Sequence, residues 1–96
     1  MYEIQFEWDE KKNQANIRKH RVSFEEAKTI FYDENARIID DPDHSVKEER
    51  FIILGRSYKF QLLTVCHCYK LSDETIRIIS ARKATKQEIK EYEELL

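Results

Sequence analysis

The sequence is poor in glycine and cysteine, and each shortage removes a class of function. A single glycine among 96 residues leaves no glycine-rich phosphate loop, so the common nucleotide-binding motifs are excluded. The two cysteines, Cys66 and Cys68, are one residue apart, and a bridge between such close neighbours is strained. We therefore expect no secreted disulfide framework, and a reducing compartment fits best.

The run Cys66-His67-Cys68 is also an incomplete metal site. Structural zinc requires four ligands, usually from two separated pairs, and the chain has no second pair. One-residue spacing on a strand would turn His67 to the face opposite the two cysteines. We expect small buried strand residues here, with no metal and no cofactor.

No long apolar run follows Met1, so we expect neither a signal peptide nor a membrane span, and a cytoplasmic protein. The length suits one domain, residues 1–96, with a single modest core. A net charge of −2 argues against a general nucleic-acid binder held by bulk positive charge. The charge is nevertheless segregated, with acids in 33–49 and cations in 11–21 and 77–90. Any role on nucleic acid must come from local placement of lysine and arginine.

The stretch from Thr75 to Glu94 organises the rest of the chain. Its first part, with apolar residues on both faces, predicts an interior strand over 76–82. Thr85 and Glu88 then have the spacing of a capping box that begins a helix. Arg82 and Lys83 are thereby held between a strand end and a helix N-terminus, where backbone donors also favour anions.

The remaining patterns predict a β-α-α-β-β-β-β-α order. Alternation predicts strands over 1–8, 36–40, 49–54 and 60–69. Asp9 can cap a polar helix over 10–20, which we expect to be largely solvated. A second capping box at 23–26 begins a helix with a buried stripe. Because the last four strands are joined by short connections, we predict an α+β fold in which helices pack on an antiparallel sheet.

Arginines lie on or beside several of these strands, and their sequence context leaves two interpretations open. A guanidinium in a strand is costly to bury unless it is paired or faces a groove. Several on one sheet face would suit phosphate oxygens. Alternatively, Arg50 and Arg82 pair with Glu49, Glu88 or acids of the loops.

The order of these features resembles the BrnT family of type II toxins over nearly the whole chain. The matching residues, in chain order, are Phe6, Glu7, Trp8, Asp9, Lys12, Asn16, Lys19, His20, the run 22–27, Glu49, Arg50, the run 54–57, the run 76–84, Glu88 and Tyr92. The last run is the most specific. The sequence departs from the family at Arg21, where glycine is frequent, and at the hairpin Tyr58-Lys59-Phe60, which lacks a common glycine.

The resemblance implies a RelE-like ribonuclease fold and metal-independent RNA cleavage that arrests translation. It also implies a BrnA-like antitoxin with a ribbon-helix-helix DNA-binding domain. The pair would repress its own operon, so operator DNA would be bound only through the antitoxin.

Attack of a 2′-hydroxyl on the adjacent phosphodiester needs a base and a stabiliser of the phosphorane charge. We expect Arg56 and Arg82 to stabilise that charge and His20 or Glu49 to act as the base, unless catalysis is mainly electrostatic. The residues expected to bind RNA are Trp8, Lys12, Lys19, Arg50, Arg77 and Lys83.

Three alternatives stay open from the sequence. Trp8 has a structural alternative as a core aromatic, and His20 has one as a cation at a helix end. The chain as a whole could instead be a non-catalytic interaction module whose basic face docks an acidic partner.

Overall fold

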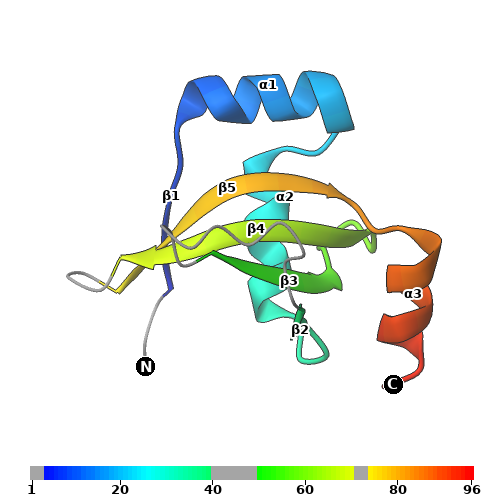
Figure 1. Cartoon of the computed structure of the whole chain (residues 1–96). Coiled ribbons are helices and arrows are strands. Elements are labelled where there is room, and N and C mark those ends of the chain that lie inside the picture. Colours follow the sequence, from blue (N-terminus) through cyan, green and yellow to red (C-terminus); the bar gives the residue numbers. More distant parts are fainter. Residues whose placement is uncertain (1–3, 40–49, 71–73) are drawn as a thin grey trace.

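The computed structural model describes residues 4–39, 50–70 and 74–96, and Figure 1 shows their arrangement. The elements are β1 (Gln5–Glu7), α1 (Glu10–His20), α2 (Phe24–Lys28), the 3-10 helix η1 (Thr29–Tyr32), β2 (Arg37–Ile39), β3 (Phe51–Arg56), β4 (Leu62–Lys70), β5 (Thr75–Lys83) and α3 (Lys86–Glu93). The predicted element order is confirmed, and η1 extends α2. No helix within these ranges is long and apolar enough to cross a membrane.

The five strands form one sheet in the order β1-β5-β4-β3-β2. β5 lies between β1 and β4, so the predicted interior strand is confirmed. The pairs β2–β3, β3–β4 and β4–β5 are antiparallel, but β1 runs parallel to β5. The sheet is therefore mixed, which corrects the expectation of a wholly antiparallel sheet. The reason is that no short hairpin joins β1 to its neighbour, so nothing forces the two to run in opposite directions.

The core lies between one face of the sheet and the α2–η1 segment, which is drawn behind the sheet in Figure 1. Phe24, Ala27 and Ile30 are fully buried, as the predicted stripe required. The single glycine belongs to this contact. A Cβ at Gly55 would lie 3.1 Å from the Cβ atoms of both Ala36 and Ile30, so a side chain here would crowd the contact between η1 and β3.

Helix α1 covers the edge of β5 through polar side chains rather than apolar ones. β1 pairs with β5 only over Thr75 to Arg77. Further along, the side-chain nitrogen of Asn16 donates to the Ala81 carbonyl at 2.8 Å, and its side-chain oxygen accepts from the backbone amide of Ala81 at 3.1 Å. Asn16 thus occupies the place of a neighbouring strand and satisfies an edge that would otherwise lack partners. The expectation of a largely solvated helix was wrong at Asn16, which is buried.

The helix ends follow the capping signals. Asp9 accepts from the amides of Lys11 and Lys12, and the reciprocal box of Thr85 and Glu88 is present at the start of α3. Arg21 ends α1 with φ 59°, in the left-handed region that favours glycine. The turn at Arg21 therefore has the geometry of a glycine cap. Arginine has a Cβ, so this conformation is strained for it.

Candidate active site

The strand register gives the sheet one face that carries polar and cationic side chains, here called the arginine face. Its members on the three central strands are Ile52, Leu54, Arg56, Leu62, Thr64, Cys66, Cys68, Arg77, Ser80 and Arg82. They share a face because directly opposed residues point the same way: Leu54 opposes Thr64, which opposes Arg82. The face opposite the core therefore holds the candidate site.

A β-bulge decides which arginines share this face. Five positions separate Arg77 from Arg82, so strict alternation would turn them to opposite faces. The register between β4 and β5 shifts at this point. Cys66 pairs with Ser80, but the next residue, His67, pairs with Ile78, so β5 has one extra residue here. The extra residue of β5 returns Arg77 to the face of Arg82.

A small hollow of about 80 Å³ lies on the arginine face where α1 ends. It is lined by His20, Ile52, Thr64, Cys66, Ser80, Ala81 and Arg82. His20 reaches it because Asn16, one helical turn earlier, is fixed against β5. The structure thus brings together two of the predicted catalytic residues, His20 and Arg82.

Arg82 is held in a fork by Glu88. Its two terminal nitrogens donate to the two carboxylate oxygens at 2.8 and 3.0 Å. Glu88 also accepts from the Thr85 amide at 2.8 Å and from the Thr64 hydroxyl at 3.0 Å. Burial raises the pKa of Glu88, but these donors, Arg82 foremost, outweigh it and lower that pKa from 4.5 to about 2. The pairing of Arg82 with Glu88, one of the two open interpretations, is therefore present.

The pairing leaves part of the guanidinium available. In the described part of the chain, Arg82 uses three N–H donors, two toward Glu88 and one toward the Lys83 carbonyl at 3.3 Å. Guanidinium has five. Arg82 is 40% exposed on the side chain, so the remaining donors can reach an anion in the hollow. Glu88 then orients the arginine rather than occupying all of it.

Arg56 lies in a different place. Its amide donates to Asp33 at 2.8 Å, and its guanidinium lies 5.5 Å from the ring centroid of Tyr92. Tyr92 donates its hydroxyl to the same carboxylate at 2.7 Å. From the strand spacing and the register, the Cα atoms of Arg56 and Arg82 are roughly 12 Å apart. Arg56 lines an open depression of about 380 Å³ at the end of β3, and not the hollow that contains Arg82.

The other predicted site residues are spread over the molecule. Lys12 and Lys19 are exposed on α1, and Lys83 is exposed on the face opposite Arg82. Arg77 pairs with Glu7 near the start of β5, which places it away from the hollow. Arg50 is half-buried directly before β3. Glu49 lies outside the described residues.

Trp8 is held by the protein itself. Its ring meets Phe24 edge to face with centroids 6.0 Å apart, and its indole N–H donates to Glu10 at 3.3 Å. It packs against the hydrophobic core while remaining partly exposed. These contacts favour the alternative in which Trp8 is a core aromatic.

The two cysteines and the histidine between them occupy opposite faces, as predicted. Cys66 and Cys68 lie half-buried on the arginine face, and neither forms a disulfide. His67 is fully buried on the core side, with its ring 4.9 Å from that of Phe31. Within residues 4–39, 50–70 and 74–96, no three His, Cys, Asp or Glu residues are grouped so that they could hold a metal ion.

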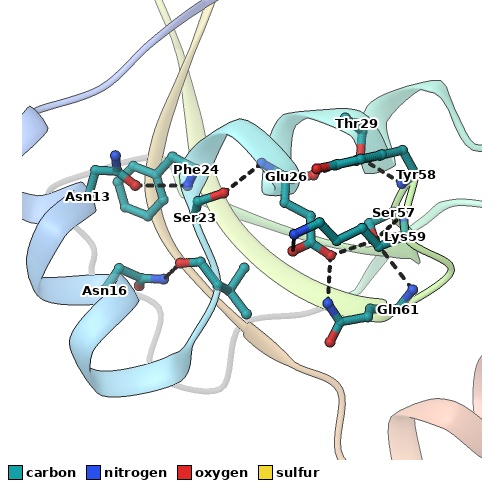
Figure 2. Close-up of polar contacts among 11 residues, drawn as sticks. Asn13, Asn16, Ser23, Phe24, Glu26, Thr29, Ser57, Tyr58, Lys59 and Gln61 are labelled. Atoms are coloured by element: carbon teal, nitrogen blue, oxygen red, sulfur yellow. Dashed lines mark hydrogen bonds and ion pairs between the residues drawn. The ribbon is translucent and has the colours of Figure 1, made fainter.

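Sequence reasoning missed Glu26. Ser23 accepts from the Glu26 amide at 3.0 Å, so this half of the predicted capping box is present. The Glu26 side chain, only 3% exposed, instead accepts from Ser57 at 2.7 Å and Gln61 at 2.9 Å, as Figure 2 shows. A capping motif cannot reveal such a use, because both partners lie more than thirty positions away.

Comparison with known proteins identifies the family of this chain. The family model described as "Ribonuclease toxin, BrnT, of type II toxin-antitoxin system" matches residues 8–88. The 1.1 Å crystal structure of the Brucella abortus ribonuclease toxin BrnT is similar, with a TM-score of 0.65 and 22% identity. The similarity covers 88% of this chain and 100% of that one, and at this identity it shows the fold. Among curated proteins, none matches the sequence.

The fold is therefore shared with a small ribonuclease toxin. This chain belongs to the BrnT family of type II toxin–antitoxin systems, since the family model spans most of its length. Membership in a type II system implies an antitoxin as partner.

Proposed function

We propose that this protein is a metal-independent endoribonuclease that cleaves RNA by attack of a 2′-hydroxyl on the adjacent phosphodiester, and so arrests translation. The observation that carries the proposal is the hollow shared by His20 and Arg82, in a chain that belongs to a family of ribonuclease toxins. One of these side chains can accept a proton, and the other can hold phosphate oxygens.

In the proposed reaction His20 takes the proton from the 2′-hydroxyl as its oxygen bonds to phosphorus. Arg82, oriented by Glu88, donates to the phosphorane oxygens as their negative charge grows. The bond from phosphorus to the 5′-oxygen then breaks, and that oxygen takes a proton from water. The products are a 2′,3′-cyclic phosphate and a free 5′-hydroxyl, so no metal-bound water is required.

Lys12 and Lys19 are proposed to position the RNA backbone. They belong to the same turns of α1 as Asn16 and His20, next to the edge of β5. The roles of Arg56 and of the remaining arginines are proposed to be electrostatic, since these residues lie outside the hollow. We also propose the cytoplasm as the place of action.

The proposed partner is a BrnA-like antitoxin with a ribbon-helix-helix domain, and the pair would bind and repress its own operator. A segment of this antitoxin is proposed to cover Lys12, Lys19 and Arg82, because silencing the toxin requires that its cationic site be blocked. Hydrogen exchange on the complex should show protection at α1 and at the end of β5. Protection confined to residues 33–49 would contradict this docking.

Growth and cleavage assays test the proposed activity. Expression of the protein alone should stop growth, and the purified protein should cut RNA in the presence of EDTA. Activity that EDTA abolishes and a divalent ion restores would place the protein in a different enzyme class. A purified, folded protein that binds its partner but never cuts RNA would instead indicate an interaction module.

A further inference from the structure

The hairpin between β3 and β4 holds two aromatic side chains in solvent. Phe60 is 82% exposed and Tyr58 is 63% exposed. Together with Tyr32 of η1, which is 61% exposed, they line the open depression of about 380 Å³ that also contains Arg56. Exposed aromatic groups gathered on one surface are unusual unless they bind something.

A buried carboxylate fixes this hairpin. Figure 2 shows the Glu26 carboxylate beside Ser57, Lys59 and Gln61, where it accepts from the Ser57 hydroxyl and the Gln61 side-chain amide, with the Lys59 ammonium 4.0 Å away. Ser57 in turn accepts from the amides of Lys59 and Gln61 at 3.2 and 3.3 Å. Burying a carboxylate costs free energy unless it is hydrogen-bonded, and here its bonds hold a surface loop.

The backbone of the hairpin is constrained further at each aromatic residue. The Tyr58 amide donates to the Thr29 hydroxyl at 3.0 Å, and that hydroxyl donates to the Glu26 carbonyl at 2.7 Å. Phe60 has φ 64°, a left-handed conformation strained for any residue with a Cβ. Strain of this kind persists at functional sites, where the surroundings enforce it. These bonds hold the hairpin backbone in one conformation, and the hairpin exposes the side chains of Tyr58 and Phe60.

We propose that Tyr58 and Phe60 stack against unpaired bases of the RNA substrate and hold it at the end of the sheet where Arg56 lies. This inference rests on the proposed ribonuclease function and adds the substrate class, single-stranded RNA. Aromatic rings with an adjacent guanidinium are the usual means of holding single strands, because every base has a π-face.

The charges around the depression favour RNA over an apolar partner. Arg56 lines it, and the Lys59 ammonium lies 5.6 Å from the ring centroid of Tyr58. The one carboxylate in its lining, Asp33, already accepts from the Tyr92 hydroxyl and from the amides of Arg56 and Asn35. The Arg56 guanidinium is thus placed to contact a phosphate next to a stacked base, and its Cα lies roughly 12 Å from that of Arg82.

The test uses three variants of the whole protein, Phe60→Gly, Tyr58→Ala and the control Leu95→Ala. Leu95 is also exposed, at 63%, but lies beyond α3. The probe is a short single-stranded RNA with 2′-O-methyl riboses, which cannot be cleaved, carrying 2-aminopurine as a fluorescent base. Dissociation constants and the quenching of that base report stacking. Rates on a cleavable RNA separate KM from kcat.

Each hairpin variant should bind the probe roughly 5- to 100-fold more weakly, the range for losing one base–aromatic stack, and should show less quenching. The loss should appear mainly in KM. Leu95→Ala should bind as the wild type does. Phe60→Gly should keep or raise the melting temperature, because glycine adopts this φ without strain, so weaker binding cannot be attributed to unfolding.

Unchanged binding and KM in both variants, with wild-type protein that still cuts RNA, would overturn this inference and leave the proposed function standing. Variants that keep RNA binding but lose the antitoxin would overturn it in favour of a protein-docking role. Wild-type protein that neither binds nor cuts RNA would overturn both.

Discussion

Substituting Arg82 and, in a separate variant, its partner Glu88 distinguishes a role of Arg82 in catalysis from a role in stability. The difference between a pKa of 4.5 and one of about 2 for Glu88 corresponds to roughly 3 kcal/mol of stability at neutral pH. Three groups supply the favourable contacts, namely the Arg82 fork, the Thr85 amide and the Thr64 hydroxyl. Since Arg82 is also 40% exposed, we assign to it about 1–2 kcal/mol.

Arg82→Ala should therefore lower the free energy of unfolding by about 1–2 kcal/mol, measured by urea denaturation. Its RNA cleavage, measured on folded protein, should fall by about 10²- to 10³-fold. Glu88→Ala should also destabilise, but it frees the guanidinium and should keep cleavage within about tenfold of the wild type. The double variant should lose less stability than the two single changes add up to, by about 1–2 kcal/mol.

Two further variants sharpen the comparison. Arg82→Lys should recover little cleavage, because an ammonium cannot donate to two phosphate oxygens in parallel as a planar guanidinium does. Lys90→Ala removes one exposed cation from α3 without touching Glu88 and should change neither property. Folded Arg82→Ala protein that cuts RNA at the wild-type rate would remove this residue from the site. Equal losses of cleavage in folded Arg82→Ala and Glu88→Ala protein would contradict the prediction that the guanidinium acts without Glu88.

Three more variants test the fold. Asn16→Ala should lower the free energy of unfolding by about 2–4 kcal/mol in urea denaturation, since it leaves both backbone groups of Ala81 unpaired; a loss below about 0.5 kcal/mol would contradict the edge pairing. Arg21→Gly should raise the melting temperature through a gain of about 1 kcal/mol, because φ 59° no longer strains a side chain; a lower melting temperature would refute this. Burial lowers the pKa of His67 from 6.5 to about 4, so its contribution to stability is complete above pH 6.5 and is lost as the pH falls to about 4. His67→Leu should flatten the decline of stability across that interval, and an unchanged pH profile would count against it.

Local signals predicted the element order well, because helix caps and strand alternation act within a few residues. Asp9 and Thr85 cap helices where the sequence placed them, and the strand over 76–82 is interior. The direction of β1 could not be predicted in this way, since its neighbour β5 is about seventy residues away. The sequence indicated His20 and Arg82 as candidate catalytic residues, but it could not predict that they line the same hollow.

What the sequence could not show depends on contacts between distant segments. β5 has a bulge beside Ser80, where its register with β4 shifts. Without this bulge, the Arg77 side chain would lie on the core face of the sheet. Asn16 looks like a solvated helix residue until β5 lies beside it. Glu26 follows the capping pattern, yet its carboxylate holds a hairpin that the local pattern does not include.

Cleavage of an RNA that carries one 2′-deoxynucleotide tests the central claim most directly. The purified protein is incubated in EDTA with two oligonucleotides that differ only in the 2′-hydroxyl at the cleavage position. We predict that the all-ribose strand is cut to a 2′,3′-cyclic phosphate and that the substituted strand stays intact at that position. Cutting of the deoxy-substituted bond, or a requirement for a divalent ion, would contradict the mechanism built on His20 and Arg82.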